Sequence, residues 1–225
     1  SIILRVMDDF GRVGYSPILT LQPGGLGYEV SVPDTATVGG PADFPVTVRL
    51  LDLGTGLVVA SQDTVFSVDV YSGQTGQLGV GSWSVGSSVL AAGTASFSQT
   101  YTGAGHIYLR VYDARGVVGI SNTIVMRPDG YKRLQLVAPG ETPLPGASSP
   151  TGKTGAAILQ QAEVPFMVQV RATDQYWNLN DGFNAGAVTL SSSEGSVQAG
   201  NPVNNGAPLI GGVGDYELII HNQGN

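Results

Sequence analysis

The sequence predicts an all-β protein made of antiparallel β-sandwiches in tandem, with an N-terminal β-hairpin that belongs to a preceding or neighbouring module. Residues 3–16 recur 105 positions later as residues 108–121, and eight of the fourteen paired positions are identical. Apolar and polar residues alternate through most of the chain, whereas helical periodicity is nearly absent. A period near 105 residues matches a β-sandwich domain of about 100 residues, and repeats at a fixed spacing indicate an array of like modules.

The repeat divides the chain into three parts. Residues 1–24 are expected to form the terminal hairpin, whose strands could complete a neighbouring module. Residues 25–128 are expected to form the first sandwich. Its strands are predicted where one face reads apolar and the other polar, at residues 28–32, 44–50, 65–70, 95–101 and 107–111. Turn signals rich in glycine separate these segments, as a sandwich requires.

Residues 129–225 are expected to form a second sandwich that lacks its last strand. A first strand at 134–137 precedes an insert, 139–155, that is rich in Pro, Gly, Ser and Thr. Residues 216–224 read as a weaker third copy of the repeated segment. The chain is therefore expected to start and stop on the same, penultimate strand of a module. Further strands are predicted at 164–172, 187–191 and 216–220.

Three segments of the second module resemble the bacterial Ig-like domains of extracellular surface, adhesin or filament proteins. They are Val-Arg-Ala-Thr-Asp-Gln-Tyr-Trp-Asn (170–178), Gly-Ala-Val-Thr-Leu-Ser-Ser-Ser (186–193) and Gly-Asp-Tyr-Glu-Leu (214–218). Trp177 stands where those domains usually carry a small residue. The resemblance implies tandem Ig-like sandwiches and says little about a ligand, because function lies in sites grafted on such folds.

Composition limits the partners. Only 12% of residues are charged, against about 25% in typical proteins, and the net charge is −7. Nucleic acids and anionic membranes need basic patches, so neither is expected as a partner, and no segment is apolar enough to insert as a membrane helix. A surface so poor in charge fits an extracellular or cell-surface protein within an assembly. With no cysteine and two histidines, a zinc site or a Cys/His nucleophile is nearly excluded.

An incomplete sandwich exposes unpaired strand edges and an apolar slot. One interpretation is that the chain is an excerpt of a longer tandem protein. The other is that the leading hairpin of one subunit completes the trailing module of the next, as in strand complementation. In either case the partners are copies of the chain or adjacent repeats. The residues expected at this interface are Ile3, Leu4, Val6, Val13, Tyr15, Ile18, Leu19, Leu218 and Ile220.

Two binding chemistries remain open beside this structural role. Asp174, Asn178, Asn180 and Asp181 form an oxygen-rich cluster after a strand, which suits calcium, although Asx residues also make turns without any ion. No other cofactor is expected. A sugar-stacking platform is the second possibility, which would make the chain a carbohydrate-binding or adhesin accessory module of a large secreted protein. The aromatic candidates are Trp83, Trp177, Tyr71, Tyr101 and Tyr176.

The sequence therefore predicts a structural or adhesive extracellular repeat protein, a building block of a surface layer, stalk or filament. It would assemble by β-strand pairing between modules or subunits. No enzymatic activity is expected.

Overall fold

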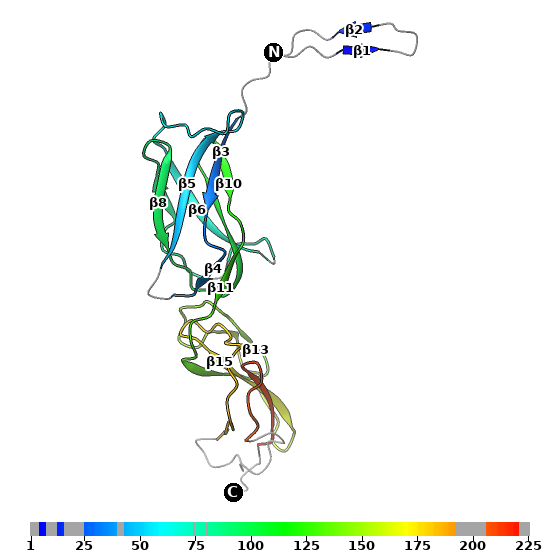
Figure 1. Ribbon diagram of the computed structural model, residues 1–225. Helices are drawn as coiled ribbons and strands as arrows, with labels where there is room; N and C mark the ends of the chain where they lie inside the picture. The colour runs from blue at the N-terminus through cyan, green and yellow to red at the C-terminus, as the bar shows by residue number, and fades with distance from the viewer. Residues whose placement is uncertain are drawn as a thin grey trace.

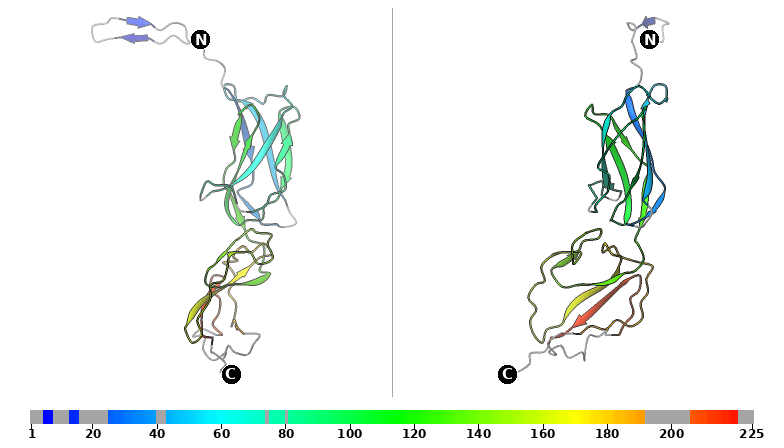
Figure 2. Two further views of the ribbon diagram at one scale, coloured as in Figure 1. Left: turned by 180° about the vertical axis from the view of Figure 1, so that it is seen from behind. Right: turned by 90° about the vertical axis from the view of Figure 1, so that its left-hand side faces the viewer.

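The computed structural model describes residues 5–7, 13–15, 25–39, 43–73, 75–79, 81–191 and 206–220, and every regular element in these ranges is a β-strand. The all-β prediction is confirmed. Figure 1 shows two β regions one after the other, and Figure 2 shows from further sides that the second lies beyond one end of the first. We call residues 25–128 the first region and residues 129–220 the second region. No helix that could span a membrane occurs in the described ranges.

The first region contains two sheets. One has the strand order β3-β5-β8, and the other has the order β4-β11-β9-β6-β7 with β10 paired to β9. All pairings are antiparallel except that of β4 with β11. The strands are β3 (Leu26–Ser31), β4 (Thr35–Thr37), β5 (Phe44–Asp52), β6 (Val65–Ser72), β7 (Ser87–Val89), β8 (Thr94–Gln99), β9 (Gly105–Tyr112), β10 (Val118–Ile120) and β11 (Ile124–Arg127).

Alternation along these strands fills one core. In β5 the side chains of Val46, Val48 and Leu50 are buried, while the residues between them reach the surface. Strands β6 and β9 of the other sheet alternate in the same way and contribute Phe66, Val68, Val70, Ile107, Leu109 and Val111 to the same cluster. Burial of these apolar faces provides the main driving force for the packing.

The second region has a smaller core. Its main sheet has the order β12-β15-β16, formed by β12 (Arg133–Val137), β15 (Phe166–Thr173) and β16 (Val213–Leu218). A separate hairpin of β13 (Glu141–Pro143) and β14 (Lys153–Gly155) lies within the Pro/Gly-rich insert. The Lys153 ammonium lies 2.6 Å from the Glu141 carboxylate across this hairpin. The buried core residues are Val168, Val170, Ala172, Val188, Leu209 and Tyr216.

The two three-stranded sheets share strand order and register. Arg49 of β5 lies opposite Glu29 of β3 and Thr94 of β8. Arg171 of β15 lies opposite Gln135 of β12 and Val213 of β16 in the same way. The turns that precede β8 and β16 also make the same contact. The Leu50 amide donates a hydrogen bond to the Gly93 carbonyl, and the Ala172 amide donates one to the Gly212 carbonyl. Below, residues in the same position of this register are called counterparts.

This register corrects one expectation. Residues 216–220 were expected to correspond to residues 108–112, which form the end of β9, but Tyr216 pairs with Val168 as Phe97 of β8 pairs with Val46. Strand β16 is therefore the counterpart of β8. Among the described residues of the second region, no strand takes the place of β9, β10 or β11. The expected second sandwich was to lack only its last strand, but three strands of the first region have no counterpart among these residues. The two segments were aligned because each begins with a tyrosine that several apolar residues follow.

The terminal hairpin consists of β1 (Arg5–Met7) and β2 (Val13–Tyr15), which pair antiparallel. Val6 lies opposite Gly14, and 105 residues later Val111 of β9 lies opposite Gly119 of β10. The sequence repeat between these segments is therefore matched by an identical pairing register. Among the described strands, β1 and β2 pair only with each other.

Candidate assembly interface

The first region shows how a β9–β10 hairpin is held. Gly119 of β10 lies against the backbone of β3, so close that a Cβ at this position would overlap the carbonyl oxygen of Tyr28. Only glycine allows this approach. The Tyr28 hydroxyl donates a hydrogen bond to Asp113 at the end of β9 (3.0 Å), and the Arg115 guanidinium lies 2.7 Å from the same carboxylate. The hairpin is thus fastened to β3 by close packing and by a charged hydrogen-bond network.

The network perturbs both of its acids. Burial raises the pKa of Tyr28 to about 12, and the hydrogen bond to the Asp113 carboxylate adds to this effect. For Asp113, burial opposes ionisation, but hydrogen bonds from Arg115, Tyr28 and two backbone amides outweigh it. The pKa of this carboxyl is therefore held below its ordinary value. The shift of Tyr28 comes from the contact between β3 and the hairpin, whereas that of Asp113 comes first from Arg115 in the hairpin's own turn and then from Tyr28 of β3.

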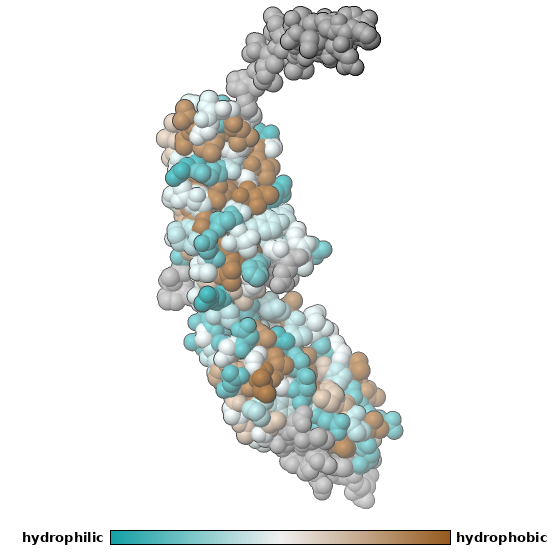
Figure 3. Space-filling view, turned by 45° about the vertical axis from the view of Figure 1, so that its right-hand side comes forward, coloured by the Kyte–Doolittle hydropathy of each residue, from teal (hydrophilic) through white to brown (hydrophobic). Residues whose placement is uncertain are grey.

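The second region leaves the corresponding side of its sheet open. Tyr28 and Val30 of β3 are each 6% exposed, whereas their counterparts Leu134 and Leu136 of β12 are 45% and 46% exposed. Both leucines lie on the core face, since their partners across the strand pair are the buried Ala172 and Val170. Figure 3 shows apolar surface on the second region as well as on the first. The exposed leucines mark the side of the sheet where no described strand of the second region takes the place that β10 has beside β3.

The outer face of β12 is covered instead. Gln135 is 2% exposed and donates hydrogen bonds to the carbonyl oxygens of Thr151 and Gly152 in the insert (3.0 and 2.8 Å). Trp177 is also buried, with its indole N–H bonded to the Ser149 carbonyl (2.8 Å) and the Arg133 guanidinium over its ring. The insert therefore packs on the outer face of the sheet, where the hydrogen bonds of Gln135 and Trp177 hold it.

Of the calcium candidates, Asn178 joins the two regions and Asp174 holds Asn178 in place. The Asp174 carboxylate accepts hydrogen bonds from the amides of Tyr176 (2.8 Å), Asn178 (3.0 Å) and Asp129 (3.2 Å), and from the Asn178 side chain (2.9 Å). The Asn178 side chain in turn accepts from the Ala104 amide and donates to the Thr102 carbonyl, both at 2.8 Å. The side-chain oxygens of Asp174 and Asn178 therefore accept hydrogen bonds from N–H groups. This is the ion-free turn interaction that was the alternative to calcium binding.

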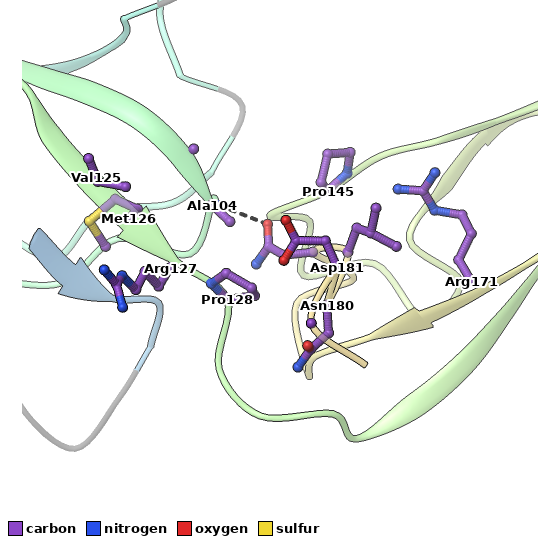
Figure 4. Close-up of a pocket in the computed structure, with 13 residues that line it drawn as sticks. Ala104, Val125, Met126, Arg127, Pro128, Pro145, Arg171, Asn180 and Asp181 are labelled. Atoms are coloured by element: carbon purple, nitrogen blue, oxygen red, sulfur yellow. Dashed lines mark hydrogen bonds between the residues drawn. The ribbon is translucent and has the colours of Figure 1, made fainter. Parts of the chain in front are cut away.

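The other two candidates lie beside a cleft between the regions. Asn180 donates a hydrogen bond to the Asp129 carbonyl (3.3 Å), and Asp181 is exposed. Both line a cleft of about 880 Å³. Figure 4 shows Arg127 on the first-region side of this cleft and Arg171 on the other. No group of three or more acidic or histidine side chains that could hold a metal occurs in the described part of the chain.

Arg171 differs from its counterpart. Arg49 forms an ion pair with Glu29 (3.1 Å), but Arg171 lies opposite the neutral Gln135. Its Nε is buried and donates no hydrogen bond to any described residue, and burial lowers the pKa of its guanidinium. The charge pair on the first sheet is therefore not repeated on the second.

The remaining aromatic candidates are distributed rather than clustered. Tyr101 is 3% exposed, and Trp83 and Tyr176 pack against the first core. Tyr71 of β6 stacks on Tyr108 of β9, the neighbouring strand in the sheet, with ring centroids 5.4 Å apart, on the outer face of the sheet. Of the five predicted residues, only Tyr71 lies in a stacked aromatic pair that is not part of the cores.

The predicted interface residues fall into three groups. Ile3, Leu4, Ile18 and Leu19 lie outside the described residues. Val6 lies in β1, and Val13 and Tyr15 lie in β2. Leu218 packs against the second core, and Ile220 is half-buried at the end of the described chain. Sequence reasoning missed Leu134, Leu136 and Gly14. Aligning Val48-Arg49-x-x-Asp52 with Val170-Arg171-x-x-Asp174, and then the strands around them, would have found the leucines. The internal repeat would have found the glycine.

Comparisons with known proteins give the chain no family. No protein-family model matches it, and no curated protein matches its sequence. Among solved structures it is similar to the periplasmic chaperone SfaE (8% identity, 68% of this chain and 95% of that chain, TM-score 0.33). It is also similar to the E. coli chaperone DraB (8% identity, 88% and 86%, TM-score 0.32) and to the Salmonella enterica SafA pilin–SafB chaperone complex (6% identity, 88% and 86%, TM-score 0.33). At these TM-scores the likeness assigns neither a function nor a partner to the chain.

Proposed function

We propose that this chain is a structural, non-enzymatic repeat protein of the cell exterior, built from tandem Ig-like β-sandwich modules that assemble by β-strand pairing between modules or subunits. The observation that carries the proposal is the shared register. The sheets β3-β5-β8 and β12-β15-β16 match position by position, and the hairpins β1–β2 and β9–β10 match likewise. A chain made of such interchangeable strands can complete one module with strands from another.

The arrangement of the two regions supports a load-bearing role. Asn178 bonds to both Thr102 and Ala104, and the Thr102 hydroxyl donates to the Gly146 carbonyl (2.7 Å). Gly146 and Gly103 approach so closely that a Cβ on Gly146 would lie 2.9 Å from the Gly103 Cα. The second region is thus held to the end of the first by direct contacts. The low charge content of the chain supports a place outside the cell, among closely packed neighbours.

A glycan-binding accessory module is the second candidate, and the stacked pair Tyr71–Tyr108 favours it. Arg110 extends this strip, since its guanidinium lies over the Tyr112 ring (4.8 Å to the centroid). Flat aromatic faces beside a cation suit a sugar ring. If this candidate holds, the unaltered chain is retained on a glycan column and Tyr108→Ala is not. If the unaltered chain passes through every glycan column tested, this candidate is removed.

The experiment for strand assembly compares the full chain with a variant lacking residues 1–24. Sedimentation velocity and electron microscopy at increasing concentration should show linear particles for the full chain and single subunits for the variant. The first region starts at Gly25, so the truncated chain keeps it, and near-UV circular dichroism checks that it is folded. Particles of equal length from both chains would refute assembly through this hairpin.

A further inference from the structure

On the basis of the proposed strand assembly, we propose that the β1–β2 hairpin of a second copy docks on the open side of the second region. It would cover Leu134 and Leu136 and pair with residues 189–191. The acceptor, the donor and their register follow from counterparts in the first region, where the same contact is made within one chain.

The acceptor segment, which is not a regular strand in the structure, is identified through two isolated bridges. Ile210 pairs with Val213 as Ala91 pairs with Thr94, and Ala187 pairs with Pro208 as Val65 of β6 pairs with Val89 of β7. Residues 187–191 therefore stand in the place of β6. The core supports this assignment, because Leu209 and its counterpart Leu90 are 0% and 1% exposed. In the first region, β6 carries β9 along its other side.

The donor segment carries apolar residues at each position that the docking needs. In the first region the inward side chains of β9 and β11 are Ile107, Leu109, Val111, Ile124 and Met126, none more than 2% exposed. Moving back by the repeat period of 105 residues gives Ile2, Leu4, Val6, Leu19 and Leu21. All five are apolar and of similar size. A hydrophobic face of this kind can fill the site that β9 and β11 fill in the first region.

The register of the docked hairpin follows from these counterparts. Because Ser67 of β6 pairs with Tyr112 of β9, Thr189 would pair with Met7. Gly14 would lie against the backbone of Leu134, as Gly119 lies against that of Tyr28. Leu134 lacks the hydroxyl that binds Asp113 in the first region, so apolar burial and main-chain pairing would hold the docked hairpin without a counterpart of that hydrogen bond.

The geometry selects a second copy as the occupant. Figure 1 shows that β3, the first strand of the first region, starts at the end that faces away from the second region. A hairpin that precedes Gly25 would have to pass the whole first region to reach Leu134 of its own chain. The donor and acceptor surfaces differ and lie at opposite ends, so the contact is heterologous and generates open filaments rather than closed dimers.

Disulfide mapping tests this contact directly, because the natural chain contains no cysteine. One preparation carries Met7→Cys and the other carries Thr189→Cys. Residues directly opposite on antiparallel strands place their Cβ atoms close enough for oxidation to link them. We expect a disulfide-linked heterodimer from the mixture. A pair displaced by two positions, Arg5→Cys with Thr189→Cys, should not link. Ser67→Cys with Tyr112→Cys in one chain is the positive control, since these residues are partners within the first region.

A steric variant provides the second arm. Gly14→Val should abolish the heterodimer because a side chain there would overlap the β12 backbone, while Val13→Thr, at a position whose counterpart Val118 is 40% exposed, should keep it. If the positive control links and the mixture does not, the docking is wrong. If linear particles form without the disulfide-linked heterodimer, subunits assemble through another contact and the proposed function is retained. If only single subunits are seen and no disulfide forms, assembly between subunits is refuted as well. In a chain that carries both Met7→Cys and Thr189→Cys, a disulfide formed within that one chain would rule out the second copy as occupant.

Discussion

The Asn178 side chain reaches out of the second region and accepts a hydrogen bond from the Ala104 amide of the first, at 2.8 Å. The same side chain donates to Thr102 and to Asp174, and Asn178 is fully buried. One amide thus satisfies groups from both regions, with each of its polar atoms in use. Its geometry leads to the first prediction.

Asn178→Asp should loosen the attachment of the two regions at neutral pH. The substitution replaces a donor with a carboxylate oxygen that faces the Asp174 carboxylate and the Thr102 carbonyl. Each buried polar group left without a partner costs about 1–3 kcal/mol, and charge repulsion adds to this cost. Calorimetry should show a lower unfolding temperature for the second region, with partial recovery at acidic pH as the new carboxyl is protonated.

Asn180→Asp serves as the matched control, because the Asn180 side chain donates one long hydrogen bond of 3.3 Å to the Asp129 carbonyl, within the second region. Its effect should be much smaller. Equal losses from the two substitutions would mean that Asn178 has no special part in joining the regions.

Trp177→Ala should destabilise the second region rather than remove a ligand site. The indole is 8% exposed, bonds the Ser149 carbonyl and lies against Gly152, where a Cβ would overlap the ring. Truncating a buried tryptophan costs about 3–5 kcal/mol. Chemical denaturation followed by circular dichroism measures the loss. An unchanged free energy of unfolding would contradict the position of Trp177 beneath the insert.

Alkaline pH should destabilise the first region between about pH 10 and pH 12. The folded-state pKa of Tyr28 is raised to about 12, whereas an unfolded tyrosine titrates near 10. Above pH 10 the unfolded chain binds fewer protons than the folded chain, so stability is complete below this pH and falls as the pH rises through the window. Burial also raises the pKa of Tyr101, which adds to the slope.

Tyr28→Phe isolates the contribution of this residue. The variant loses the hydrogen bond to Asp113 and is less stable at pH 7, but its stability should fall less steeply between pH 10 and pH 12. Denaturant titrations at a series of pH values give both slopes. Parallel curves for the variant and the natural chain would show that Tyr28 ionises normally in the folded state.

Calcium should leave the unfolding temperature of the second region unchanged. The Asp174 oxygens already accept four hydrogen bonds from N–H groups, and a cation there would have to displace them. Thermal scans with calcium and with a chelator make the comparison. A calcium-dependent rise that disappears in Asp174→Asn would favour the ion over the turn chemistry.

Strand positions could be predicted where apolar and polar residues alternate and one face of the strand packs on a core. Residues 44–50 and 107–111 alternate in sequence, and they form β5 and β9 with the expected buried faces. The hairpin of β1 and β2 was predictable from the repeat alone. In these cases local pattern and tertiary packing agree, so the sequence contains the information needed.

The exposed side of the second region was not predictable in this way. Alternation places Leu134 and Gln135 on opposite faces but does not say which face will be covered. The insert buries the polar Gln135, and nothing described covers the apolar Leu134. Here the polar side chain is buried and the apolar one is exposed, which reverses the usual arrangement. The assignment of Tyr216 failed for a related reason. Similar residues occur in two strands, and only the pairing with Val168 distinguishes them.

The unequal cores of the two regions have a mechanical consequence. A pull along the molecule passes through both regions in series, so each bears the same tension. Among the residues that the structure describes, six form the buried cluster of the second region, and the cluster of the first region is three times as large. The second would yield at the lower force and release its folded length first. The chain would thus lengthen under load while the first region stays folded, as an extensible element rather than a rigid rod.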